Sequence, residues 1–204
     1  MAGNNGKEIR VAGTGRVLIA PVETEAPATI ATAWDPAKWT DLGYTTTDGI
    51  KFNKKDKIDP VDTWQSVSPA RFIYSDRDLT VKFQLMQLNK ATLAFFMGGG
   101  AVKPATTTTT PPAGLDAQAD PEFKEFTYDL ANSPVADERA LGIEFTDGAS
   151  IYRFVVPRGQ VTETEEIGLT RTGAVKLGVT FTALAKNDTA PLASFRMKEL
   201  STSY

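Results

Sequence analysis

Carboxylate side chains are the best candidates for chemistry in this sequence, because the chain contains neither histidine nor cysteine. Histidine is the commonest general base at neutral pH, and cysteine is a frequent nucleophile. The densest acidic positions outside the middle of the chain are Asp76, Asp78, Glu163, Glu165 and Glu166. A glycosidase would hold two carboxyl groups across a cleft, but the sequence pairs none of these. There is also no nucleophile-elbow or metal motif, so we expect no catalytic residue and no enzymatic activity.

Three aspartates at regular spacing, Asp56, Asp59 and Asp62, could suggest a calcium loop. No glycine stands at the turn position and no glutamate at the twelfth position, so the spacing does not fit an EF-hand. The glycine motifs at 13–15 and 98–100 could suggest phosphate binding. The first has no helix after it, and the second ends a helix rather than starting one. We therefore expect no metal site and no cofactor.

The formal net charge of −3 gives the chain no basic field that would hold DNA or an anionic membrane. Between residues 116 and 147, nine acidic residues accompany only Lys124 and Arg139, and a solvated acidic surface is the simplest interpretation. No apolar run approaches the ~20 residues that span a bilayer. The first residues lack the apolar stretch of a signal peptide, and we expect no membrane insertion.

Short apolar or alternating segments predict a mainly antiparallel β fold, a sandwich or barrel, formed by one domain over residues 1–204. The predicted strands are 15–22, 79–85, 123–128, 140–145, 151–156, 161–169, 175–185 and 194–200. The strand at 79–85 alternates most clearly, and its odd-numbered residues, including Phe83, should face the core. Asp147 and Gly148 predict a hairpin turn.

One flanking helix is predicted from Lys90 to Met97. Asn89 is a suitable N-cap, and the glycines at 98–100 should end the helix. Its apolar residues Leu93, Phe96 and Met97 share one face by helical spacing.

Four segments are predicted to extend from the core. They are an arm at 1–14, a projecting loop or hairpin at 45–69, a low-complexity surface loop at 101–119, and a strand or tail at 194–204. The projecting segment is polar but studded with apolar residues, which predicts packing against another subunit. These candidate interface residues are Ile50, Phe52, Ile58, Val61, Trp64 and Val67. The tryptophans Trp34, Trp39 and Trp64 could equally belong to the core or anchor an interface.

Three parts of the chain, in this order, resemble the major tail tube proteins of siphophages. They are GRVLIAPV at 15–22 with 26–27 and WTDLGYTTTDG at 39–49; LTVKFQL at 79–85 with the helix after Asn89; and FVVPRGQV at 154–161 with GAVKLGVTFTAL at 173–184. Each motif alone is weak, but their joint order in a chain of this size is more specific.

The resemblance implies a β-sandwich or barrel that assembles with itself into homo-hexameric rings, and rings that stack into a tail tube. It implies further partners: a tape-measure protein, tail-end proteins, and double-stranded DNA that passes without specific binding. The expected location is the virion tail, with assembly in the host cytoplasm. The alternative function for such a β-sandwich is a carbohydrate-binding or adhesin module, in which exposed aromatic side chains would line a sugar groove.

Polar strand positions are candidates for the channel wall of such a tube. Alternation singles out Thr80, Gln84, Thr162, Glu163 and Thr164. Alternation cannot separate a channel face from an outer face, so these residues could also solvate the exterior. The acidic balance of the chain predicts a channel surface that is neutral or negative.

Overall fold

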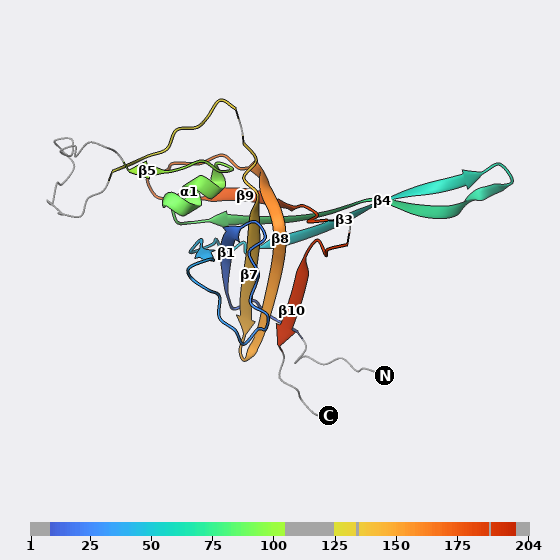
Figure 1. Cartoon of the computed structure of the whole chain (residues 1–204), viewed down its shortest axis with the longest axis horizontal. Helices are drawn as coiled ribbons and strands as arrows, with labels where there is room; N and C mark the ends of the chain where they lie inside the picture. The colour runs from blue at the N-terminus through green and yellow to red at the C-terminus, as the bar shows by residue number, and fades with distance from the viewer. Residues whose placement is uncertain (1–8, 105–124, 134, 188, 199–204) are drawn as a thin grey trace.

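The computed structural model describes residues 9–104, 125–133, 135–187 and 189–198 (Figure 1). Most of the predicted arm and low-complexity loop, and the last six residues, lie outside these ranges. The strands and helix are β1 Thr14–Pro21, β2 Thr40–Asp41, β3 Lys51–Thr63, β4 Ser66–Leu85, α1 Lys90–Phe96, β5 Lys103–Pro104, β6 Phe126–Thr127, β7 Arg139–Asp147, β8 Ser150–Thr164, β9 Leu177–Ala183 and β10 Ser194–Lys198.

One antiparallel sheet contains eight of these strands, in the order β2-β1-β7-β8-β9-β4-β3, and β10 pairs with β8. The sheet folds over so that β1, β7 and the first half of β8 form one layer, while β9 and β4 form the other (Figure 1). The prediction of a mainly antiparallel β-sandwich with one short helix is therefore confirmed.

Strand β8 belongs to both layers. Its first half pairs with β7 on one side and β10 on the other, and its second half pairs with β9. The sequence predicted separate strands at 151–156 and 161–169, which is wrong, because one strand runs from Ser150 to Thr164. Pro157 lies inside this strand, where the pairing with β7 shifts register and a missing N–H is tolerated.

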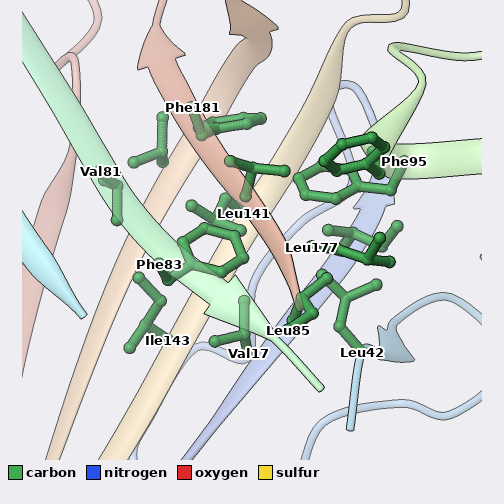
Figure 2. Packing of buried hydrophobic residues seen from close by; sticks show 14 of the residues in the cluster. Val17, Leu42, Val81, Phe83, Leu85, Phe95, Leu141, Ile143, Leu177 and Phe181 are labelled. Atoms are coloured by element: carbon green, nitrogen blue, oxygen red, sulfur yellow. The ribbon is translucent and has the colours of Figure 1, made fainter. Parts of the chain in front are cut away.

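The main core lies between the two layers (Figure 2). Phe83 is only 3% exposed, which confirms that the odd-numbered face of its strand is buried. Its ring stacks on Phe95 of α1, which in turn stacks on Phe181 of β9. The helix therefore covers one end of the sandwich.

Helix α1 begins as predicted, because the Asn89 side chain accepts hydrogen bonds from the first turn and Thr92 completes a capping box. Its buried face, however, is Thr92, Phe95 and Phe96. The predicted buried face, Leu93, Phe96 and Met97, differs from the observed one by about one residue. The apolar run 93–97 is compatible with both faces of the helix.

A second apolar cluster covers the outer surface of the first layer. Trp34 and Trp39, from the loop between β1 and β2, pack edge to face at 4.6 Å over Leu18 and Val155. Both indoles are buried, so these two tryptophans belong to the core and do not anchor an interface. Around these two tryptophans, the first layer is thus covered on its outer side as well as on its core side.

Strands β3 and β4 form a long hairpin that leaves the sandwich (Figure 1). The predicted projection at 45–69 is confirmed as a hairpin, but its boundaries differ. Thr45 forms a bridge with Leu85 in the body of the sandwich, whereas the return strand projects along residues 66–78, beyond the last pairing with β9 at Thr80. The single strand β4 therefore joins the projection to the core.

Candidate functional site

The distal part of the hairpin, residues 58–74, is a two-stranded ribbon; we call it the distal ribbon. Ile58 pairs with Tyr74 and Pro60 pairs with Phe72, so these side chains share one face. On the other face, Asp59 pairs with Ile73 and Val61 pairs with Arg71. The exposed large apolar residues of the ribbon are Ile58, Val61, Trp64, Val67, Phe72, Ile73 and Tyr74.

Both faces of the distal ribbon therefore expose apolar side chains. Trp64, at its tip, is 99% exposed. An isolated two-stranded hairpin is marginally stable in water, and a contiguous exposed apolar patch usually marks an interaction surface. The ribbon is thus suited to be covered by another molecule.

An ion cluster lies at the base of the ribbon. Asp56 accepts from Lys54 Nζ at 2.5 Å and from Arg77 Nε at 2.8 Å. The hydrogen bonds from Lys54 and Arg77 lower the pKa of Asp56. Because all three side chains remain in contact with water, we expect the cluster to fix the orientation of the strands more than it stabilises them.

The six predicted interface residues do not all lie in the ribbon. Ile50 packs on the main core, and the ring of Phe52 lies 4.4 Å from that of Phe154 on β8. The other four belong to the distal ribbon. The sequence analysis missed Phe72, Ile73 and Tyr74, although extending the strand at 79–85 backwards would have reached this three-residue apolar run.

A polar face covers the outer side of the second layer. Thr80 pairs with Thr182, and Thr182 pairs with Gln160; Thr180 pairs with both Lys82 and Glu163. Directly paired residues share a face of a sheet. The structure therefore brings the predicted positions Thr80, Gln84, Thr162 and Glu163 together on this face. Thr164 pairs with Val179, whose side chain is buried, and so lies on the opposite side.

Hydrogen bonds join side chains across the polar face. The hydroxyls of Thr162 and Thr182 lie 2.8 Å apart, and Gln84 Nε2 donates to Glu165 at 2.6 Å. Glu165 folds over Gly178, where a Cβ would come within 2.2 Å of its carboxylate. Because Gly178 has no side chain, it leaves room for the Glu165 side chain to cross the sheet.

Charges on the polar face are balanced. Lys82 Nζ lies 3.9 Å from Glu163, and the carboxylate of Glu165 lies beside Gln84. The edge strand β3 adds Lys51, Lys55 and Lys57 to this face, opposite Lys82, Asp78 and Asp76 of β4. Lys55, Lys57 and Lys82 thus each lie opposite or beside an acid. Paired in this way, they are poorly placed to hold phosphates.

The structure does not assemble the acidic candidates into a catalytic pair. Asp76 and Asp78 lie on the projecting part of β4, whereas Glu163, Glu165 and Glu166 lie at and beyond the end of β8. Asp56 and Asp59 lie on opposite faces of β3. Among the described residues, no group of three or more His, Cys, Asp or Glu is arranged to hold a metal ion.

Three acids of the segment at 116–147 form ion pairs, which corrects the expectation of a solvated surface for this part. Glu138 pairs with Arg158, and Asp137 pairs with Arg139. The hydrogen bond from Arg158 lowers the pKa of Glu138. Glu144 takes part in a larger network.

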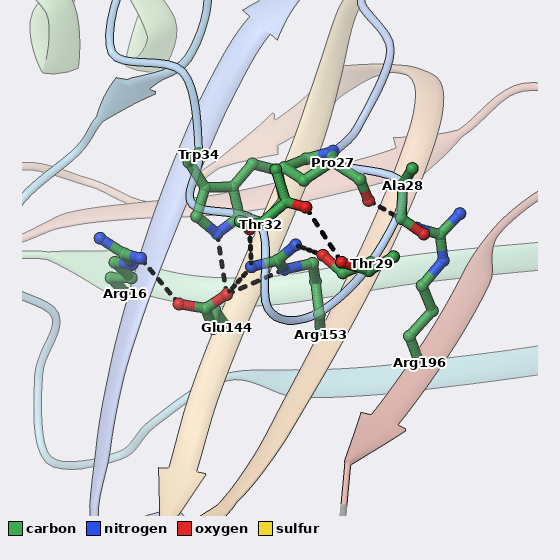
Figure 3. A network of polar contacts seen from close by, with 9 residues as sticks. All are labelled: Arg16, Pro27, Ala28, Thr29, Thr32, Trp34, Glu144, Arg153 and Arg196. Atoms are coloured by element: carbon green, nitrogen blue, oxygen red, sulfur yellow. Dashed lines mark hydrogen bonds and ion pairs between the residues drawn. The ribbon is translucent and has the colours of Figure 1, made fainter.

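That network lies under the loop of Trp34 (Figure 3). Glu144 accepts from Arg153, from Arg16 Nη2 at 2.7 Å and from Trp34 Nε1 at 3.0 Å. Burial alone would raise the pKa of Glu144, but the hydrogen bonds from Arg153, Arg16 and Trp34 outweigh burial and lower it. The carboxylate therefore stays charged inside the protein.

The same network fixes the loop between β1 and β2. Arg153 donates to the carbonyls of Thr29 and Thr32 at 3.0 and 3.1 Å, and Arg196 donates to those of Pro27 and Ala28. These bonds satisfy four loop carbonyls that strands cannot reach. Sequence analysis missed the network, although the predicted turn at 147–148 implies the register that places Glu144 opposite Arg153.

No helix in the described ranges is long and apolar enough to cross a membrane. A family model described as phage tail tube protein matches residues 1–204. No curated protein matches the chain.

Proposed function

Because the chain belongs to the phage tail tube protein family, we propose that it polymerises into stacked hexameric rings that form the tube of a long, non-contractile tail. Double-stranded DNA passes through this tube into the host. A protein of this family is a structural component of the virion tail, so tail proteins are its partners; the tape-measure protein and the tail-end proteins are the ones we propose. Assembly takes place in the host cytoplasm.

The distal ribbon is the observation that carries this proposal. It projects from the sandwich and exposes apolar residues on both faces, so a neighbouring subunit covers it in the assembly. A ribbon of one copy that contacts a different surface of the next makes a head-to-tail contact, which repeats without limit unless it closes on itself. Such contacts generate both rings and stacks.

Open strand edges support the same conclusion. Strand β3 ends the second layer, and β10 pairs with β8 alone among the described strands. Unpaired edges offer backbone N–H and C=O groups to another chain. The four side chains on β3 at Lys51, Lys54, Lys55 and Lys57 limit indiscriminate pairing, because lysine on an edge strand disfavours it.

The polar face is the surface that we assign to the channel. The outer side of the first layer is covered by the loop of Trp34 and Trp39, whereas the described strand residues on the outer side of the second layer are polar. Balanced charges let phosphates pass without the counterion release that makes binding tight. We assign Thr80, Gln84, Thr162 and Glu163 to the wall.

The positions of the tryptophans do not favour the carbohydrate-binding alternative. A sugar groove needs exposed aromatic rings on a concave surface, but Trp34 and Trp39 are buried in the core. Trp64 is exposed at the tip of a projecting ribbon.

Electron microscopy of the purified protein tests the proposal, with a trimmed variant as the decisive sample. Replacing residues 59–73 by Asn-Gly joins Ile58 to Tyr74 through a two-residue turn and keeps the sandwich. We expect tubes from the unmodified chain and a folded, non-assembling protein from the trimmed chain. Leu169→Ser, at an exposed loop position, is the matched control and should assemble. Normal tubes from the trimmed chain would contradict the role assigned to the distal ribbon, and an unmodified chain that stays monomeric would contradict the proposed function.

A further inference from the structure

A row of aromatic rings runs across the lower half of the first layer. Phe145 stacks on Tyr152 at 4.8 Å, and Tyr152 and Phe154 lie 6.2 and 6.3 Å from Phe195 of β10. At its upper end, Phe154 contacts Phe52 at the base of the hairpin. These rings are on the core side of the layer, because Ile143 and Val156 in the same alternation belong to the main core.

The lower end of this row is exposed at β10. Phe195 is 49% exposed, and Met197, which pairs with Tyr152 on the same face, is 57% exposed. In Figure 1 the lower parts of β7, β8 and β10 extend past β4, so no described strand of the second layer lies over them. We call Phe145, Tyr152, Phe195 and Met197 the aromatic row; Tyr152 is only 5% exposed, and Phe195 and Met197 form the accessible part.

At the distal ribbon the relation between the layers is reversed, because here the second layer is the longer one. Where β4 shifts register against β3, between Lys57 and Ile58, the extra residue is on β4. The alternation of β3 therefore continues unbroken, and Ile58 lies on the same face as Phe52. The face formed by Ile58, Phe72 and Tyr74 is thus an extension of the core side of the second layer. There the second layer extends past the first.

We propose that the Ile58 face of the distal ribbon of one copy packs on the aromatic row of another copy, and so completes in trans the two-layer packing that each copy leaves open. Both surfaces are core-facing sheet surfaces, the arrangement in which two sheets stack about 10 Å apart. The named residues of both surfaces are all apolar or aromatic, so contact between these residues buries no charge.

The occupant is a second copy rather than the chain's own ribbon. Ile58 lies six residues beyond Phe52, or about 20 Å along an extended strand. The hairpin leads away from β10 over that length (Figure 1). This inference rests on the proposed function, because it specifies which surface of the neighbouring subunit receives the ribbon.

A rival receiving surface lies at the other end of β4, where Tyr44, Met86 and Leu88 are exposed. These side chains come from loop positions after β4 and before β3, and do not form a sheet face. The aromatic row lies on one face of the paired strands β7, β8 and β10, and a second strand layer packs on such a sheet face.

Cysteine cross-linking in assembled protein tests the pairing, and the chain has no cysteine of its own. Copies with Tyr74→Cys are mixed with copies with Met197→Cys, assembled, and treated with a short bismaleimide. We expect covalent dimers from the mixture, a ladder of multimers when one chain has both substitutions, and at least tenfold less product from either variant alone. A disulfide is not used, because it demands Cα atoms within about 7 Å.

The outcomes separate this inference from the proposed function. Tubes in which Tyr74→Cys fails to cross-link to Met197→Cys, or cross-links to Leu88→Cys instead, overturn the inference and leave the tube proposal standing. Absence of tubes from the unmodified chain overturns both. As a second measurement, Phe195→Ser with Met197→Ser should reduce tube mass at least tenfold while the circular dichroism of the subunit is unchanged. Equal tube mass from this variant and from Leu169→Ser would also overturn the pairing.

Discussion

Arg153 donates from Nε and from Nη2 to the same carboxylate oxygen of Glu144, with Nε at 2.8 Å, and the arginine side chain is only 2% exposed. Removing one partner of such a pair leaves a buried charge without compensation. The pair therefore determines how firmly the loop of Trp34 is held.

We predict that Glu144→Gln lowers the free energy of unfolding by about 3 kcal/mol at pH 7. Because the pKa of Glu144 is lowered in the folded state, its contribution is fully present above the ordinary glutamate pKa of about 4.3 and is lost as pH falls through the lowered pKa. Urea unfolding from pH 7 to pH 3 measures both effects, and the variant should show the flatter profile. Glu138→Gln removes a more exposed pair and should cost clearly less; equal losses in the two variants would refute the prediction.

Gly142→Ala should destabilise the protein by about 1–3 kcal/mol, as overpacking does. A Cβ at this position would come within 2.5 Å of the indole of Trp34 and 3.1 Å of that of Trp39, and neither ring can move away without disturbing the loop. Thermal unfolding measures the change. Gly168→Ala has nothing within 4 Å and should leave the midpoint nearly unchanged or slightly higher; a comparable loss there would show that packing is not the cause.

Phe83→Asp should prevent folding, because it places a carboxylate among the rings of Phe95 and Phe181 at a cost of several kcal/mol. The neighbouring Lys82 points to the polar face, so Lys82→Asp should give a folded subunit. Near-ultraviolet circular dichroism distinguishes the two. A folded Phe83→Asp protein would mean that the core side of β4 is wrongly assigned.

Thr182→Lys should turn the channel wall into a DNA-binding surface. The position lies at the centre of the polar face, and six copies in each proposed ring would form a ring of cations. We expect empty tubes of this variant to bind double-stranded DNA with an affinity that falls steeply with salt. Ala31→Lys adds the same charge in the loop over the first layer and should leave DNA binding inside the tube unchanged. If Ala31→Lys confers the binding and Thr182→Lys does not, the polar face is not the channel.

Local patterns were enough to predict the parts of the fold that depend on near neighbours. The alternation at 79–85 predicted the buried Phe83, and Asn89 predicted the start of α1. The polar candidates on β4 and β8 came together because alternation places them on one side of adjacent strands. Thr164 departed from them because a register shift after Val161 reverses the side that the next residues face.

Features that depend on pairing across the sheet were not predicted. The ribbon beyond residue 69 was missed because a strand exposed on both faces has no apolar alternation to detect. Trp34 and Trp39 could not be placed, since their burial depends on a loop that folds back over β1 and β7. The continuity of β8 was missed because Pro157 ends strands in most contexts and is accommodated here by a bulge.

The shared strand β8 has a mechanical consequence. One unbroken backbone runs through both layers of the sandwich, so the two layers cannot shear past each other without breaking the hydrogen bonds of β8 with β7 or β9. Each subunit is therefore stiff across its thickness. In the proposed tube, we expect the strain of bending to be taken up between subunits, where the ribbons slide on their neighbours, so that the bore keeps its diameter.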